Sequence, residues 1–226
     1  MDLGLKGRVA IVTGSSRGIG LAIAISLAKE GAKVAVCSRD EANIKKAAKE
    51  IASTTGSEVL PVKADLRNLT DIKLLVKRTI YVFKSVNILV NNTGGPPSKL
   101  FLETSNEDWR ESYESLMMSI INCCREVVPY MKENKWGRII NMTSFAAKQP
   151  VERLILSNAI RAGVLGFTKT LSNEMAEYGI LVNAVCPGWT QTKRLVELAS
   201  SRAEKTRKTI EAIFAAWAEG IPLKRL

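Results

Sequence analysis

The sequence predicts an α/β fold, in which a parallel sheet is covered by helices on both faces. Short β-branched apolar runs alternate along the chain with longer segments of helical apolar spacing, and the first run ends in a glycine-rich turn. Parallel strands require crossover helices, and these cover the two faces of the sheet. Right-handed crossovers place the carboxyl ends of the strands at one edge, where we expect the ligand.

This alternation continues without an internal repeat, linker or low-complexity tract, and it predicts one domain over residues 1–226. The predicted strands are 9–12, 33–37, 59–64, 86–90, 138–142 and 181–185. The predicted helices are 21–28, 40–54, 70–83, 105–133, 152–178 and 193–217.

The turn between the first strand and the first helix predicts an anion-binding site. Gly14, Gly18 and Gly20 follow the strand directly. Glycines permit a sharp turn and let a pyrophosphate approach the backbone, while the helix start directs N–H groups at it. The turn residues Ser15, Ser16, Arg17 and Ile19 belong to the same predicted site.

The composition narrows the possible classes of protein. The chain lacks histidine, and its four cysteines show no C-x-x-C spacing, so we predict no metal site. Cysteines in apolar surroundings, with neither a signal peptide nor an apolar run of ~18 residues, predict a cytoplasmic protein without membrane contact. The net charge of +11 is dispersed, with no nucleic-acid recognition motif, and it suits phosphorylated cofactors and acidic substrates.

Four motifs, in order and at matching spacing, resemble the short-chain dehydrogenase/reductase family. They are Thr13-Gly14-x-x-x-Gly18-Ile19-Gly20, Asp65-Leu66, Asn91-Asn92-Thr93-Gly94 and Pro187-Gly188-Trp189-Thr190-Gln191-Thr192. The resemblance implies an oxidoreductase with a Rossmann-type doubly wound sheet of strand order 3-2-1-4-5-6. Members usually continue with one more helix and a seventh strand, for which this sequence shows no segment. Oligomers are usual in the family, which implies a homodimer or homotetramer.

The resemblance also implies a nicotinamide cofactor. Ser38 stands where an Asp or Glu would bind the ribose hydroxyls of NAD(H), with Arg39 beside it and Arg17 in the glycine turn. Two guanidinium groups and a hydroxyl suit a 2′-phosphate, so NADP(H) is the predicted cofactor. By resemblance, Asp65 and Leu66 contact the adenine, Asn92, Thr93 and Gly94 lie along the ribose, and Pro187, Gly188, Thr190 and Thr192 hold the carboxamide.

The catalytic residues depart from the family's pattern, which is an Asn, a Ser, and a Tyr followed four residues later by a Lys. Ser144 occupies the serine position, whereas Ser157, Arg161 and Leu116 stand at the tyrosine, lysine and asparagine positions. A serine hydroxyl is a far weaker acid than a phenol. Arg161 keeps its proton near neutrality, yet it can donate to the cofactor ribose. The Ser157–Arg161 pair resembles a divergent branch whose members are named 3-oxoacyl-carrier-protein-reductase-like.

Three functions are compatible with this pattern, and the first is preferred because the cofactor motifs are intact. The first is an NADP(H)-dependent reductase of a carbonyl or alcohol substrate: a 3-oxoacyl thioester, a sugar or a small ketone. Its proton would come from a water ordered by Ser144 and Ser157, or from Lys148 or Tyr113. The second is an NADP(H)-binding sensor or scaffold without turnover. In the third, the basic surface binds nucleic acid or a membrane.

The last predicted helical segment is a candidate cover for the substrate site. Residues 193–218 carry charge on one side and lie beyond the last predicted strand. We expect this segment to cover the substrate.

Overall fold

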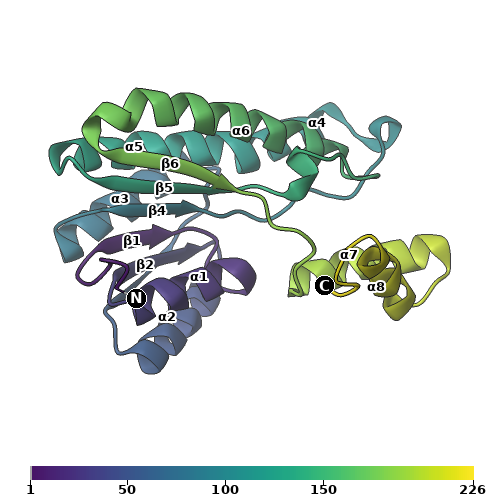
Figure 1. Ribbon diagram of the computed structural model, residues 1–226, viewed down its shortest axis with the longest axis horizontal. Helices are drawn as coiled ribbons and strands as arrows, with labels where there is room; N and C mark the ends of the chain where they lie inside the picture. Colours follow the sequence, from purple (N-terminus) through teal and green to yellow (C-terminus); the bar gives the residue numbers. More distant parts are fainter. Residues whose placement is uncertain (1) are drawn as a thin grey trace. The chain divides into compact units, whose positions relative to one another are not determined.

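The computed structural model describes residues 2–226, which divide into two compact units, the first ending at Cys186 and the second comprising Pro187–Leu226. The first unit is a sheet with helices on both faces, and the second contains the helices α7 and α8 (Figure 1).

All strand pairs in the sheet are parallel, and the strand order is β3-β2-β1-β4-β5-β6, which confirms the predicted fold class and order. The strands are β1 (Val9–Val12), β2 (Lys33–Ser38), β3 (Val59–Lys63), β4 (Ile88–Asn91), β5 (Gly137–Met142) and β6 (Ile180–Val185). β1 pairs with β2 on one side and with β4 on the other. The strand order therefore reverses at β1, the position where doubly wound sheets bind their ligands.

Two groups of helices bury the two faces of this sheet (Figure 1). The helices α1 (Gly18–Lys29) and α2 (Glu41–Thr55) pack with Ala10 and Val12 of β1. On the opposite face, Val9 and Ile11 share a core with α3 (Leu69–Phe83), α5 (Ser119–Glu133) and α6 (Ile155–Met175). Both faces of β1 are buried, which is why the strand is apolar throughout instead of alternating.

Three differences from the predicted helices bear on the site. α1 begins at Gly18, so the second and third glycines of the motif lie in its first turn. The helix predicted over 105–133 comprises α4 (Asn106–Tyr113) and α5, joined by a π turn, Glu114–Met118, of the kind often found at functional sites. α6 begins at Ile155 and not at residue 152, because Arg153 has a φ of 63°, which a right-handed helix excludes.

Buried side-chain hydrogen bonds link the ends of β4 and β5 to α6. The Asn91 side-chain amide donates to Asn141 Oδ1 at 2.9 Å, and the Asn141 amide donates to Thr168 Oγ1 at 2.9 Å. The Thr168 hydroxyl in turn donates to the carbonyl of Val164 at 2.7 Å. Because these buried groups have partners, they fix the strand ends without the cost of an unpaired polar group.

The second unit has a small apolar core of its own. α7 (Lys193–Thr206) and α8 (Ile210–Glu219) pack around Ala199, Ala203 and Ile213. These are two helices where the sequence predicted one, because Arg207 adopts a φ of 53° and ends α7. Within residues 2–226, no helix combines the length and apolar character needed to cross a membrane.

Candidate active site

The glycine turn has the conformation of an anion-binding loop. Gly14 and Gly18 have φ values of 56° and 60°, which favour glycine strongly. No side chain caps the start of α1, and its first turn holds no acidic residue. The amides of that turn and the positive end of the helix dipole therefore suit a phosphate group.

Thr13 and Asn92 fasten this turn to the end of β4. The Thr13 hydroxyl donates to the Asn92 carbonyl at 2.9 Å and accepts from the Asn92 backbone amide at 2.8 Å. The Asn92 side-chain amide donates to the carbonyls of Thr13 and Gly14 at 3.3 and 3.1 Å. We name this set of four bonds the Thr13–Asn92 clamp.

The clamp explains why two positions of the motif need glycine. A Cβ on Gly14 would lie 2.6 Å from the Asn92 carbonyl oxygen, and one on Gly20 would lie 2.5 Å from the Gly14 carbonyl oxygen. Both distances are shorter than a real contact, and both involve backbone atoms that cannot rotate away. Gly20 therefore allows α1 to pack closely against the turn, a role distinct from phosphate contact.

Ser15 lies inside the turn and holds it to the sheet. Its side chain is fully buried, with the hydroxyl donating to the Val12 carbonyl at 2.7 Å and accepting from the Cys37 amide at 3.1 Å. The backbone N–H of Ser15 also donates to the Cys37 carbonyl, at 3.1 Å, so both the hydroxyl and the amide of this predicted cofactor residue are bound by protein. Ser16 and Ile19 are partly exposed and Arg17 is exposed. Burial raises the pKa of the Cys37 thiol to about 12, so this cysteine stays neutral.

The ends of β2 and β3 bring Ser38, Arg39 and Asp65 together. The Ser38 hydroxyl donates to the Asp40 carbonyl at 2.9 Å, and Arg39 is exposed. Arg67 donates to both carboxylate oxygens of Asp65, with the shortest N···O distance at 2.6 Å. This bond lowers the pKa of Asp65, and Arg39 contributes through its charge. Sequence reasoning missed Arg67, although its spacing from Asp65 could have indicated an ion pair.

Leu66, Thr93 and Gly94 also lie at the carboxyl edge of the sheet. Leu66 is partly exposed and packs against the core on the α3 side. Thr93 is partly exposed, and its hydroxyl donates to the Gly94 carbonyl at 3.3 Å.

Arg161 is buried, and it joins the carboxyl ends of β4 and β5. Its Nη1 donates to the carbonyls of Met142 and Thr143, each at 3.0 Å, and its Nη2 donates to the Gly94 carbonyl at 3.3 Å. A lysine ammonium is a point donor, whereas the guanidinium fork reaches carbonyls on two strand ends at once. Arg161 therefore organises the backbone from which the neighbouring site residues project.

The two candidate catalytic serines flank this guanidinium. Ser144 directly follows Thr143, and its hydroxyl accepts from the Ala146 amide at 3.2 Å, which leaves its proton available for donation. Ser157 lies one helical turn before Arg161 on α6 and is 7% exposed. Residues four apart share a helix face, so the structure brings Ser157 and Arg161 together, with Ser144 on the adjoining strand end.

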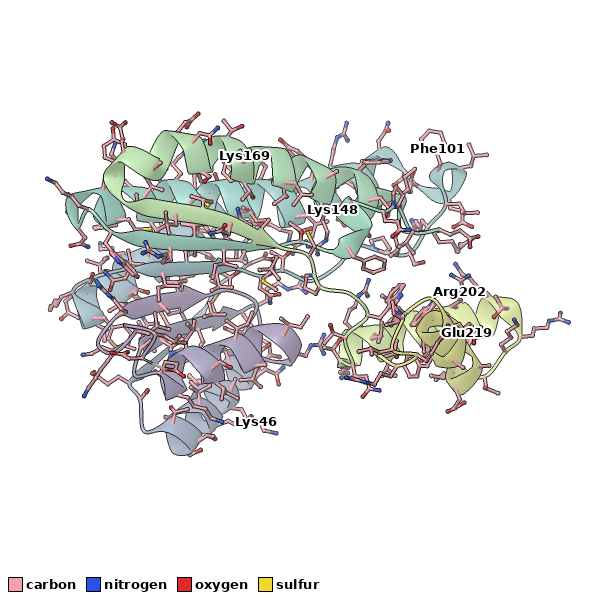
Figure 2. All side chains as sticks on the ribbon, in the orientation of Figure 1. Lys46, Phe101, Lys148, Lys169, Arg202 and Glu219 are labelled. Carbon is pink, nitrogen blue, oxygen red and sulfur yellow. The ribbon has the colours of Figure 1, made fainter. Side chains whose placement is uncertain are left out.

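The other positions considered for proton transfer lie in different surroundings. Lys148 is exposed on the loop after β5 (Figure 2), and Tyr113 is 46% exposed at the end of α4. Leu116, at the asparagine position, is 1% exposed inside the π turn. An apolar side chain there can neither donate a proton nor hold a water.

Pro187, Gly188, Thr190 and Thr192 belong to the second unit. The Thr190 hydroxyl donates to the Gly188 carbonyl at 3.3 Å, and Thr192 caps α7 by accepting from the Leu195 amide at 3.3 Å. Trp189 lies between these residues and stacks on Trp217 of α8, with ring centroids 4.5 Å apart and an interplanar angle of 5°. The predicted carboxamide segment is thereby held to the helix pair of its own unit.

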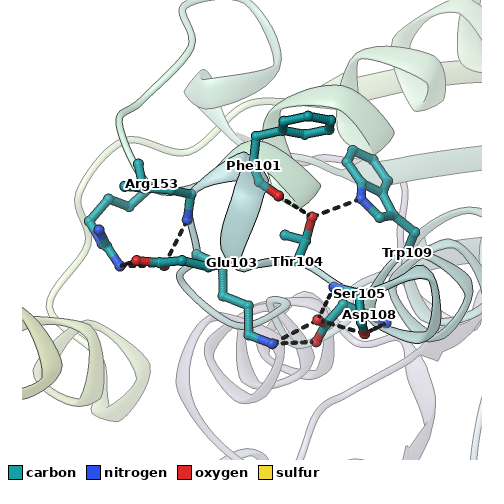
Figure 3. A network of polar contacts seen from close by, with 9 residues as sticks. Phe101, Glu103, Thr104, Ser105, Asp108, Trp109 and Arg153 are labelled. Carbon is teal, nitrogen blue, oxygen red and sulfur yellow. Dashed lines mark hydrogen bonds and ion pairs between the residues drawn. The ribbon is translucent and has the colours of Figure 1, made fainter.

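Arg153, just before α6, is held in a costly conformation (Figure 3). Its φ of 63° costs of order 1–3 kcal/mol for a residue other than glycine. Its Nε is buried without a hydrogen-bond partner, which adds about 1–3 kcal/mol. The ion pair that it forms with Glu103, at 2.6 Å, is partly exposed and contributes about 0–1 kcal/mol.

This chain is a doubly wound α/β protein, and the glycine turn and the start of α1 lie at its switch point, where such sheets bind nucleotides. A family model described as short chain dehydrogenase matches residues 8–203. A 3-oxoacyl-[acyl-carrier-protein] reductase of Synechocystis sp. is 37% identical over 188 residues, which are 83% of this chain and 76% of that protein. The chain therefore belongs to the short-chain dehydrogenase family of oxidoreductases, as its motifs predict.

Two solved structures share this fold closely. L-sorbose reductase from Gluconobacter frateurii, complexed with NADPH and L-sorbose, has a TM-score of 0.94 and 32% identity, covering 100% of this chain and 86% of that one. A variant of actinorhodin polyketide ketoreductase with NADPH has a TM-score of 0.92 and 34% identity, covering 96% and 84%.

Gly20→Ala tests the close packing of α1 on the glycine turn. The new methyl group has no room, so we expect the free energy of unfolding to fall by about 1–3 kcal/mol. Gly166→Ala in α6 is the matched control, because a Cβ there meets nothing within 4 Å. Alanine favours a helix over glycine by up to ~1 kcal/mol, so the control should be stabilised. Equal stabilisation of both variants in urea titrations would contradict the packing model.

Proposed function

We propose that this protein is an NADP(H)-dependent reductase of a carbonyl substrate. The observation that carries the proposal is the clamped glycine turn at the switch point, where Gly14 and Gly18 have left-handed backbone conformations and the first turn of α1 has neither a side-chain cap nor an acidic residue. This arrangement fits the pyrophosphate of a dinucleotide. NADPH in two solved relatives of the same fold supports the choice of cofactor.

The preference for NADP(H) over NAD(H) rests on the end of β2. Ser38 replaces the carboxylate that would bind two ribose hydroxyls and repel a phosphate. Arg39 is exposed next to it, and Arg17 is exposed in the glycine turn. Guanidinium groups bind phosphate bidentately, so these two arginines are the proposed 2′-phosphate ligands.

In this proposal the bound cofactor supplies the hydride, and the chain orients the substrate and provides a proton. Ser144 keeps a donor proton at the strand end and would hydrogen-bond the carbonyl oxygen that becomes an alcohol. Arg161 would place a fixed positive charge near the nicotinamide ribose of the bound cofactor. The proton would reach the oxygen through a water held by Ser144 and Ser157, since Lys148 and Tyr113 lie on exposed surface.

The proposed substrate is a 3-oxoacyl thioester, a ketose sugar or a small ketone. The Synechocystis relative is named for the first class and the Gluconobacter relative for the second. Both present a carbonyl carbon to the cofactor, and orientation alone supplies several kcal/mol of the barrier reduction. The helical segment 193–218 would cover that substrate, and assembly as a homodimer or homotetramer stays a prediction.

A second function is favoured by one specific observation. The Arg161 guanidinium donates to three backbone carbonyls, and the hydroxyl of Ser157 lacks the acidity of the family's phenol. A site built this way could bind NADP(H) firmly without turning it over, as a sensor or scaffold does.

Arg39→Ser tests the proposed phosphate ligand. Losing a charge-assisted bond to phosphate should weaken NADPH binding roughly 10- to 100-fold and leave NADH binding unchanged. Arg125→Ser on α5, where the exposed Arg125 donates to the neighbouring Asn122 side chain, is the matched control. Dissociation constants from fluorescence titration give the comparison. Equal loss for both cofactors would mean that Arg39 does not read the 2′-phosphate.

Turnover tests the reductase against the sensor. We expect the natural protein to oxidise NADPH with at least one member of a panel of ketones, 3-oxoacyl thioesters and ketoses. Ser157→Tyr combined with Arg161→Lys should raise kcat, because a phenol near an ammonium is a better acid. If both proteins bind NADPH and only the double variant turns over, the sensor function replaces the reductase.

A further inference from the structure

Two loops that follow neighbouring strands are fastened to one another (Figure 3). Residues 94–105 follow β4, and residues 148–154 lie between β5 and α6. Lys99 and Leu154 form an isolated parallel β-bridge, and the Ser98 hydroxyl donates to the Arg153 carbonyl at 3.3 Å.

The ion pair between Glu103 and Arg153 completes this fastening. Arg153 Nη2 donates to both carboxylate oxygens of Glu103, at 2.9 and 2.6 Å. Glu103 is itself held in place, because its carboxylate accepts from the Leu100 amide at 2.9 Å. Close by, Lys99 donates to both oxygens of Asp108 at 2.9 and 2.7 Å, and this bond lowers the pKa of Asp108 to about 2.

Stability does not explain an arginine at position 153. The left-handed backbone and the unpartnered Nε are both unfavourable, and a glycine would remove both. The ion pair is too exposed to offset them, with side-chain exposures of 19% for Arg153 and 42% for Glu103. Strain that persists without a stability gain indicates a functional role.

The contacts between the two loops lie at the start of α6, the helix that contains Ser157 and Arg161. Leu154 is the N-cap of α6, Ser157 lies in the first turn, and Arg161 lies one turn later. Arg161 is bonded to Gly94, at the beginning of the first loop. Loop 94–105 is thus tied to α6 and to the residues just before it at four points: by Arg161 near the beginning of the loop, by Ser98 and Lys99 in its middle, and by Glu103 near its end.

We infer that Glu103 and Arg153 are positioning residues, which together hold the first turn of α6, with Ser157, at a fixed place opposite loop 94–105. This inference rests on the proposed reductase function. The glycine turn is held separately, by the Thr13–Asn92 clamp. Breaking the pair should therefore disturb the handling of the carbonyl substrate and leave cofactor binding intact.

The test compares Arg153→Gly, Glu103→Gln and the charge-swapped double variant Glu103→Arg/Arg153→Glu. Glu107→Gln, which removes a fully surface ion pair on α4, is the matched control. The melting temperature of Arg153→Gly should equal or exceed that of the natural protein, since glycine readily adopts a φ of 63°. Its kcat/KM for the ketone should fall about 10- to 100-fold, as should that of Glu103→Gln, whereas the Kd for NADPH stays within about twofold. The swapped variant should recover much of the loss, and the control should match the natural protein.

Two outcomes overturn the inference. The first is an unchanged kcat/KM in both single variants, and the second is a loss that simply follows the melting temperature. Amide hydrogen exchange supplies a readout that does not need turnover: both single variants should lose protection over residues 154–161 and 94–105. If the natural protein turns over no ketone, the proposed function fails, and unchanged exchange would overturn the positioning role on its own.

Discussion

The arrangement of the site depends on the bonds by which Thr13 and Asn92 join the ends of β1 and β4. These two strands are adjacent although 75 and more residues separate them, and the Thr13 hydroxyl both donates to and accepts from Asn92. The Asn92 amide then fixes the Gly14 carbonyl, and that carbonyl limits position 20 to glycine. One threonine and one asparagine thus set the shape of the turn, and the turn sets where α1 begins and where its amides point.

Arg161 organises the rest of the site, at the position where the family's pattern has a lysine. Arg161 spans the ends of β4 and β5 through the carbonyls of Gly94, Met142 and Thr143, in the region where buried Asn91 and Asn141 already join those strands. A guanidinium is permanently charged, so it can order a backbone and attract a cofactor, but it cannot relay a proton. In the proposed reductase, proton supply would therefore fall to hydroxyls and water, and the Glu103–Arg153 pair would contribute by holding Ser157 in place.

The fold was predictable from the sequence because each strand is a short apolar run and each turn carries a glycine or a capping residue. β1 illustrates this: four apolar residues before a glycine turn identify the strand, and the family resemblance supplied its predicted position in the sheet. Positions that depend on contacts between distant segments could not be predicted. Arg153 in a left-handed conformation, the π turn at Leu116 and the buried hydroxyl of Ser15 each depend on partners distant in sequence, and no local pattern encodes them.

The most direct test of the central claim follows the hydride itself. NADPH deuterated at both C4 positions would be incubated with the natural protein and a ketone, and the product alcohol analysed by mass spectrometry. If the protein is a reductase that relies on Ser144, Ser157 and Arg161, the product alcohol should carry a single deuterium on its carbinol carbon. The Ser144→Ala variant should form no labelled alcohol. Bound NADPH with no labelled alcohol from any substrate class would contradict the reductase and leave a protein that only binds its cofactor.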